Sequence, residues 1–174
     1  MNNPPLPEPW LRGTLIDVPP IQRAVLHALE LAQEDLERWC GSLSDEELNA
    51  SPDGIAPMAF HLRHIARSLD RLLTYAEGRQ LAAEQIASLK LESAPGAIGS
   101  ELFSELHLAL TASAARVRAF GVEQLGEPRK VGKKELPTTV GGLLVHVADH
   151  TQRHVGQAVT TAKIVMARRS VANH

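Results

Sequence analysis

Three histidines stand four residues apart in the carboxyl-terminal third of the sequence, namely His146, His150 and His154. If this stretch is helical, side chains four positions apart lie on one face, so two imidazoles can point at a common centre. Neutral imidazole is a ligand for zinc, nickel, copper and iron, so such a pair forms part of a metal site. A complete site needs at least one further ligand from another part of the chain.

A helical projection at about 100° per residue distinguishes the three histidines, because the apolar residues of this stretch mark its inward face. His154 lies about 50° from the centre of that face, His150 about 90° and His146 about 130°. We therefore expect His150 and His154 to border the core and His146 to face solvent. Asp149 lies about 170° from the centre, which predicts a surface position for this carboxylate.

A second pair of histidines, His61 and His64, could supply the third ligand. The two are three residues apart and therefore lie on neighbouring parts of one helix face. The aliphatic stripe of this stretch lies closer to His61, whereas His64 shares its side with Phe60, Ser68 and Tyr75. The projection leans toward His61 but leaves both histidines as candidates, since a helix in a bundle contacts two neighbours.

The elements that must position these histidines are four long helices. Apolar periodicity and capping residues predict helices from Pro19–Pro20 to Gly41, from Pro57 to Ala76, from Ser100 to Gly121, and from Thr138 to about Arg168. A capping box over Ser44–Glu47 opens a short helical turn, residues 79–90 resemble a short linking helix, and residues 126–136 an exposed loop or hairpin. The predicted fold class is all-α, a four-helix bundle with short linking helices.

The predicted domain organisation is an irregular amino-terminal arm over residues 1–17, followed by the bundle over residues 18–170. The arm is rich in Pro and Asn, and Trp10 and Leu11 are the residues that we expect to attach it to the bundle. Of the remaining histidines, we expect His27, His107 and His174 to be exposed.

Composition excludes several classes of protein. Hydrophobic residues make up 44% and charged residues 22% of the 174 residues, as in globular domains with a proper core. A net charge of −2 offers no general attraction for nucleic acid. No uncharged apolar run approaches about 18 residues, so we expect no membrane span. Cys40 is the only cysteine, which excludes an intrachain disulfide, and the sequence predicts a cytoplasmic protein.

Two motifs in this order resemble the DinB/YfiT-like superfamily of bacterial metal-dependent four-helix bundles. The motifs are His64-Ile65-Ala66-Arg67-Ser68 and His150-Thr151-Gln152-Arg153-His154-Val155-Gly156-Gln157, and the resemblance covers most of residues 18–168. It implies that His64, His150 and His154 bind the metal, with His61 as a neighbour of the site or a substitute ligand. Many relatives have His at the position of Arg153 and often Arg at that of Val155, so the resemblance implies the three ligands but no supporting role for those two positions.

Three neutral imidazoles leave a divalent cation with open positions, which is typical of a catalytic site. The resemblance implies zinc or nickel, with iron or manganese as alternatives. It also implies a small-molecule substrate, a low-molecular-weight thiol cofactor and a homodimer. The function that it favours is a thiol-dependent S-transferase or a related hydrolase. The sequence identifies no general base.

Two non-catalytic alternatives remain: a metal-binding or stress-associated bundle, and a dimeric interaction module. A cavity beside the histidines, between the second and fourth long helices and lined by Phe60 or Tyr75, would favour the enzyme.

Overall fold

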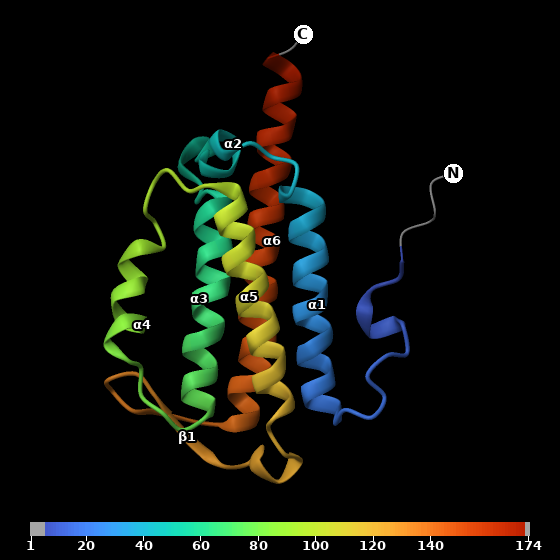
Figure 1. Ribbon diagram of the computed structural model, residues 1–174, viewed down its shortest axis with the longest axis vertical. Coiled ribbons are helices and arrows are strands. Elements are labelled where there is room, and N and C mark those ends of the chain that lie inside the picture. Colours follow the sequence, from blue (N-terminus) through green and yellow to red (C-terminus); the bar gives the residue numbers. More distant parts are fainter. Residues whose placement is uncertain (1–5, 173–174) are drawn as a thin grey trace.

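The computed structural model describes residues 6–172, and four long helices run side by side within them (Figure 1). These are α1 (Pro20–Cys40), α3 (Met58–Ala76), α5 (Gly99–Arg118) and α6 (Val140–Ala172). The all-α bundle predicted from the sequence is therefore confirmed. No helix of the described chain combines the length and hydropathy that a membrane span needs.

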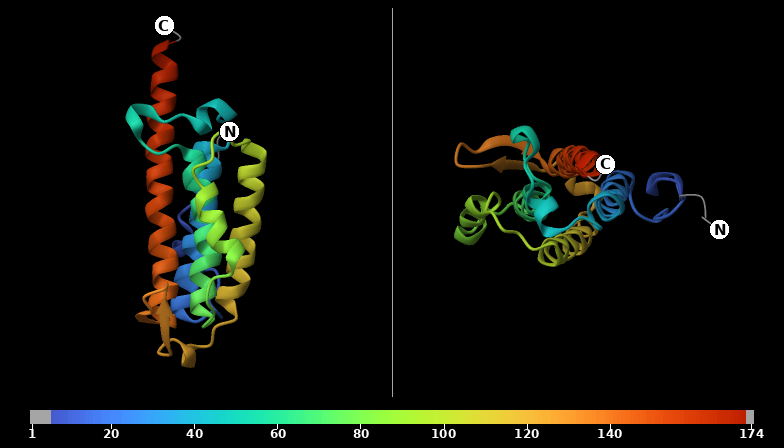
Figure 2. Two further views of the ribbon diagram at one scale, coloured as in Figure 1. Left: turned by 90° about the vertical axis from the view of Figure 1, so that its left-hand side faces the viewer. Right: turned by 90° about the horizontal axis from the view of Figure 1, so that it is seen from above.

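Each long helix packs against two others, in the order α1, α6, α3, α5 around the bundle, as the view from above shows (Figure 2). Their facing sides bury an apolar core in which the aliphatic side chains of all four helices meet. The contact that matters for the histidines is the one between α3 and α6, because it brings His64 and His61 opposite His150 and His154.

Helices α3 and α5 run in the same direction, so the chain between them must return along the outside of the bundle (Figure 1). This return segment, residues 77–98, contains the short helix α4 (Ala83–Ser88) and the 3-10 turn η3 (Leu89–Leu91). The linking helix predicted over 79–90 is thus shorter and is followed by a 3-10 turn. Gly78 with φ +78° ends α3 in a left-handed conformation, and α4 begins only at Ala83.

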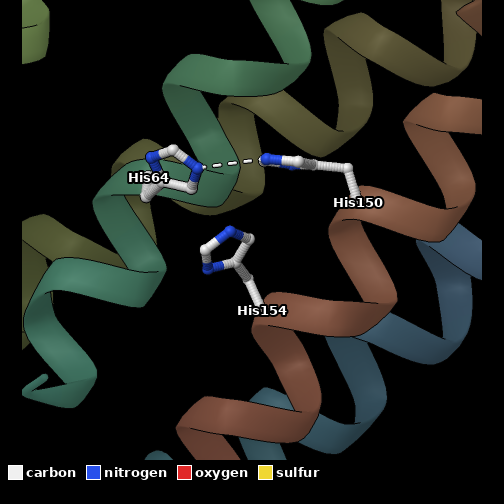
Figure 3. Close-up of side chains that lie close together, drawn as sticks. All are labelled: His64, His150 and His154. Atoms are coloured by element: carbon white, nitrogen blue, oxygen red, sulfur yellow. Dashed lines mark hydrogen bonds between the residues drawn. The ribbon is translucent and has the colours of Figure 1, made fainter. Parts of the chain in front are cut away.

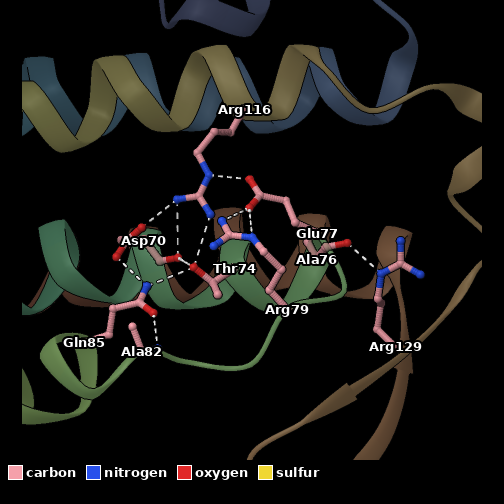
Figure 4. Close-up of polar contacts among 9 residues, drawn as sticks. All are labelled: Asp70, Thr74, Ala76, Glu77, Arg79, Ala82, Gln85, Arg116 and Arg129. Carbon is pink, nitrogen blue, oxygen red and sulfur yellow. Dashed lines mark hydrogen bonds and ion pairs between the residues drawn. The ribbon is translucent and has the colours of Figure 1, made fainter.

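Polar contacts attach the lower end of the return segment to its neighbours (Figure 4). Gln85 of α4 donates to the Asp70 carboxylate at 2.6 Å and to the Thr74 hydroxyl at 2.9 Å, both on α3. Arg116 of α5 donates to the carboxylates of Asp70 at 2.7 Å and Glu77 at 2.6 Å. The contacts of Asp70 therefore join three helices at one point.

Arginines of α3 bind the rest of the return segment. The Arg63 guanidinium donates to the Ala94 carbonyl oxygen at 2.6 Å, and that of Arg67 donates to the Ser88 carbonyl oxygen at 3.1 Å. Arg63 and Arg67 are four residues apart, so they lie on one face of α3. This face holds the segment against the bundle, although few of the segment's own side chains are buried.

The remaining elements are short. They are η1 (Pro9–Leu11), α2 (Asp45–Asn49), η2 (Pro52–Gly54), η4 (Val122–Gln124), and the strands β1 (Pro128–Val131) and β2 (Leu136–Thr139). The strands pair antiparallel, with Pro128 opposite Thr139 and Val131 opposite Leu136, so the predicted loop or hairpin is a hairpin. The capping box of Ser44 and Glu47 at the start of α2 is confirmed.

Two predicted caps are wrong. Thr138 belongs to β2, and it is the hydroxyl of Thr139 that accepts a hydrogen bond from the Gly142 amide at 3.0 Å at the start of α6. Helix α5 begins at Gly99, before the predicted cap Ser100. The Asp45 carboxylate accepts a hydrogen bond from the Gly99 amide at 2.8 Å. The cap of α5 is therefore supplied by a residue distant in the sequence and not by Ser100.

The amino-terminal arm is attached differently from the prediction. Trp10 and Leu11 are 62% and 57% exposed, so neither anchors it. Instead, the Arg12 guanidinium donates to both carboxylate oxygens of Glu34 on α1, at 2.6 and 2.7 Å. The prediction for His27 is also wrong: its side chain is buried, and its Nε2 lies 3.1 Å from the Thr14 hydroxyl of the arm.

Two leucines of α5 test the packing of the bundle. Leu106 is buried in the core, whereas Leu108 is 67% exposed. Replacing Leu106 by Ala should lower the free energy of unfolding by about 2–5 kcal/mol, because it leaves a cavity between packed helices. Leu108→Ala should change it by less than about 0.5 kcal/mol. Urea unfolding followed by circular dichroism measures both, and equal losses would contradict this packing of α5.

Candidate metal centre

Three of the histidines singled out from the sequence come together between α3 and α6 (Figure 3). His64 of α3 and His150 and His154 of α6 each offer one ring nitrogen, and these nitrogens all lie within 4.8 Å of one another. The Nε2 atoms of His64 and His150 are 3.3 Å apart. We refer to these three residues as the histidine cluster.

The position of the cluster follows from the faces that α3 and α6 bury. Ile65, next to His64, is fully buried, and Val147 and Val155 of α6 are 0% and 2% exposed. These apolar neighbours fix how each helix is turned toward the other, so the adjacent histidines meet at the edge of the core. The ring centroids of His64 and His154 are 4.2 Å apart, and those of His150 and His154 4.7 Å.

The geometry of the cluster fits a metal ion. Imidazole nitrogens about 2.0–2.1 Å from a tetrahedral ion are roughly 3.3 Å from one another. The two Nε2 atoms of His64 and His150 already have this separation. His154 lies within reach of the same centre, and one of its ring nitrogens points toward the other two rings (Figure 3). The three residues could therefore hold one cation with small side-chain rotations.

A buried carboxylate sets the orientation of His64. The Nδ1 atom of His64 lies 2.7 Å from Glu92 Oε2, so its Nε2 is the nitrogen that faces the cluster. Glu92 is 4% exposed, and its other oxygen accepts a hydrogen bond from the Arg71 guanidinium at 2.7 Å. A histidine bound to a carboxylate on the far side of its ring is the usual arrangement around a protein-bound metal.

Sequence reasoning missed Glu92 and Arg71. Glu92 lies in the return segment just after η3, where no periodicity predicts which side chains point inward. Arg71 follows His64 by seven residues, which is about two helical turns, so it lies on the same face of α3. The spacing of seven residues indicates that Arg71 lies on the face of His64, but it does not identify Glu92 as the partner of the arginine.

The structure also distinguishes His61 from His64. His61 is 3% exposed, and its Nδ1 lies 3.1 Å from Nδ1 of His154. That contact uses the ring nitrogen of His154 adjacent to the side-chain stem, which leaves Nε2 of His154 for the cluster. His61 is not part of the group of converging nitrogens, and it holds His154 from behind.

The imidazole ring of His150 has no hydrogen bond within the described chain on the side that faces away from the cluster. Among the described residues, Nδ1 of His150 is buried and has no hydrogen-bond partner. Its ring contacts the rings of His64 and His154, at centroid distances of 5.0 and 4.7 Å. His150 is therefore the least constrained member of the cluster.

Burial keeps the imidazoles of His150 and His154 neutral. It lowers the pKa of His150 and of His154 to about 4, and repulsion from neighbouring positive charges acts in the same direction. Burial, together with His154 and His64, also lowers the pKa of His61 to about 4. Neutral imidazole is the form that binds a metal ion, so these residues are in the binding form at pH 7.

One side of the cluster borders a cavity of about 260 Å³. Its polar lining consists of His64, His150, Ser68, Arg71 and Tyr75, and its apolar lining of Leu72, Leu81 and Leu89. Leu81 and Leu89 come from the return segment, which therefore forms one wall of the cavity. Tyr75 lines this cavity, which is one of the two linings that would favour an enzyme. Phe60, the other candidate, borders a separate cavity of about 310 Å³ together with Glu92.

Comparison with known proteins agrees with this architecture. The family model of the DinB superfamily matches residues 28–158.

The chain belongs to the DinB superfamily.

Two solved structures have the same fold as this DinB protein. A conserved protein from Enterococcus faecalis is 23% identical with a TM-score of 0.68, covering 84% of this chain and 97% of its own. YfiT from Bacillus subtilis is 16% identical with a TM-score of 0.62, covering 82% of this chain and 86% of its own. YfiT is described as a probable metal-dependent hydrolase with an unusual four-helix bundle topology. No curated protein matches the chain.

Among the described residues, no other histidine offers a nitrogen to the cluster. His146 is exposed, as predicted, and its Nδ1 is 3.8 Å from the exposed carboxylate of Asp149. His107 is exposed, whereas the buried His27 contacts the arm. His174 lies outside the described residues.

The contact between Glu92 and His64 predicts an effect on metal affinity. Glu92→Gln keeps the shape of the side chain but removes the charge that orients His64. We expect the affinity for zinc to fall about 10–100-fold. Competition with a chromogenic chelator measures the zinc affinity. The control is Glu105→Gln, which removes the carboxylate partner of Arg67, and it should leave the zinc affinity unchanged. Equal affinities of Glu92→Gln and the original protein would contradict this role.

The lowered pKa values predict a pH-dependent stability of the metal-free DinB protein. The unfolded chain, with histidine pKa near 6.5, binds more protons than the folded one, so stability is full above about pH 6.5 and falls toward pH 4. We expect a lower free energy of unfolding at pH 5.0 than at pH 7.5 in urea titrations. The difference should shrink in His154→Asn, and stability that rises on acidification would contradict the assignment.

Proposed function

We propose that this DinB protein is a metal-dependent hydrolase in which His64, His150 and His154 hold one divalent cation. The observation that carries the proposal is the convergence of three imidazole nitrogens within 4.8 Å at the wall of a cavity. Zinc or nickel suits three imidazoles best, with iron or manganese as alternatives. The description of YfiT as a probable metal-dependent hydrolase supports the same reading.

The cavity favours an enzyme over a metal-storing or structural bundle. A structural zinc site is closed by four protein ligands, whereas a catalytic site keeps a position open. Here three histidines converge, and His64 and His150 border about 260 Å³ of space with a largely apolar outer wall. When bound there, a divalent cation supplies a Lewis acid that polarises a carbonyl group and lowers the pKa of water to roughly 7.

The residues of the chain would provide orientation and an apolar wall. Glu92 holds His64 with its Nε2 toward the cluster, and Arg71 offsets the charge of that carboxylate. Leu81 and Leu89 of the return segment form part of the wall of the cavity. No carboxylate is among the described residues that line the cavity. We therefore expect small esters or lactones as substrates rather than amides, whose cleavage depends more on a general acid or base.

A thiol-dependent S-transferase is the second candidate, and the same absence of a lining carboxylate favours it. A thiol that coordinates a metal ion loses its proton, so a thiolate nucleophile needs no side-chain base. A low-molecular-weight thiol would then be the cofactor. The size of the cavity argues for the hydrolase, because about 260 Å³ is below the range of about 300–1,000 Å³ typical of ligand pockets.

Metal-dependent turnover tests the proposal. Protein prepared without a nickel column, stripped with a chelator and reloaded with one equivalent of zinc or nickel, is assayed with 4-nitrophenyl acetate and butyrate. We expect metal to restore hydrolysis, and His150→Ala to lose bound metal and at least about 100-fold in metal-dependent rate. His146→Ala, with an exposed imidazole one turn away, should keep both.

A parallel assay with a small thiol and 1-chloro-2,4-dinitrobenzene distinguishes the transferase. Activity in that assay alone would replace the hydrolase by the second candidate. Stoichiometric metal without turnover in either assay would indicate a non-catalytic bundle. Failure to bind any divalent cation would refute the site itself.

A further inference from the structure

Tyr75 is the only tyrosine of the chain, and its side chain is 9% exposed on the inner part of α3. It borders the same cavity as His64 and His150. Within residues 6–172, its hydroxyl makes no hydrogen bond, either with a side chain or with the backbone. A tyrosine hydroxyl that has no partner within the described chain and borders a cavity beside a candidate metal centre is free to bind a ligand.

Away from the histidines, the described polar lining of the cavity contains one other hydroxyl, that of Ser68, and the Arg71 guanidinium. Arg71, one turn before Tyr75 on α3, donates to the Glu92 carboxylate at 2.7 Å. The Ser68 hydroxyl donates to the Ile65 carbonyl oxygen at 3.1 Å. Of the two hydroxyls among the described residues that line the cavity, that of Tyr75 is thus the one without a partner. The Arg71 guanidinium keeps further N–H donors besides the one that binds Glu92.

The charges and walls of the cavity indicate what this hydroxyl would contact. Arg71 offsets the charge of Glu92, so a cation bound to three neutral imidazoles would leave the cavity positive and favour an oxygen-rich or anionic group. Leu72, Leu81 and Leu89 form an apolar wall that suits an aliphatic group. The volume of about 260 Å³ limits the ligand to a compact molecule.

We infer that Tyr75 is a substrate-contacting residue of the proposed hydrolase. Its hydroxyl donates a hydrogen bond to an oxygen of a small aliphatic acyl compound, whose reacting end lies at the histidine cluster. The inference rests on the proposed function, because it needs the cluster to be the place where the substrate binds. It adds the substrate class, which is a short branched or unbranched acyl group carrying two oxygens.

Ligand binding to the cobalt-loaded protein tests this inference without an activity assay. Cobalt(II) replaces zinc and has a visible spectrum that changes when a ligand enters an open position. The probes are 3-methylbutanoate, a short aliphatic carboxylate with two oxygens, and azide, which offers no oxygen to Tyr75. In Tyr75→Phe we expect 3-methylbutanoate to bind about 10–100-fold more weakly, and azide as before, since a hydrogen bond to a charged oxygen is lost.

Thr160→Val is the control, because it removes a hydroxyl that lies outside the cavity and is already paired within α6. It should leave the dissociation constants of both probes unchanged. A second measurement uses the original protein alone. With tyrosine labelled at Cζ, the single ¹³C resonance of the zinc-loaded protein should shift on addition of 3-methylbutanoate and stay in place with azide.

The outcomes separate the two proposals. If Tyr75→Phe binds 3-methylbutanoate as tightly as the original protein and the ¹³C resonance stays in place, Tyr75 does not contact the substrate, although the metal site stands. The inference is also overturned if azide binds the cobalt and 3-methylbutanoate does not, because the cavity then rejects the acyl group. If the original protein takes up no cobalt, the proposed function fails together with the inference.

Discussion

The antiparallel packing of α3 against α6 is the contact on which the whole site depends. Both helices bury apolar residues directly beside their histidines, such as Ile65 and Val155. The rotation of each helix about its axis is therefore fixed by burial of apolar surface, the dominant favourable contribution to folding. The histidines occupy the edge of this contact, where one side of the cluster is core and the other is a cavity. Their convergence is thus a consequence of core packing.

The parallel course of α3 and α5 has a second consequence for function. It forces the connection between them to run back along the bundle, and this return segment supplies both Glu92 and the outer wall of the cavity. A simple up-and-down bundle with short loops would contain the histidines but would lack these groups. Arg63, Arg67 and Arg71, spaced four residues apart along α3, attach the segment through its backbone carbonyls and Glu92. The orientation of His64 therefore depends on a segment that contributes little to the core.

What could be predicted from the sequence is what depends on local periodicity. The four long helices, the outward position of His146 and the inward position of His150 and His154 follow from a repeat of 3.6 residues, and the structure agrees. The choice between His61 and His64 did not follow, because both lie on faces of α3 that contact a neighbour. Family resemblance indicated His64, and in the structure His64 lies with His150 and His154 in the cluster, while His61 contacts His154 from outside it.

The features that escaped prediction all depend on contacts between distant parts of the chain. Glu92 reaches His64 from an irregular segment, Asp45 caps α5 from another helix, and Arg12 rather than Trp10 attaches the arm. A buried His27 was likewise unexpected, since its partner Thr14 lies in the arm. Long-range polar pairs leave no periodic trace in a sequence, so they become visible only when the fold brings the partners together.

If three imidazoles from two helices share one cation, anomalous diffraction should locate that ion. Crystals of the protein prepared without added metal are measured above and below the absorption edges of zinc and nickel. We expect a single strong peak between α3 and α6, about 2.0–2.1 Å from one nitrogen each of His64, His150 and His154. A peak at other residues, or crystals soaked in zinc that show no density at the histidine cluster, would contradict this expectation.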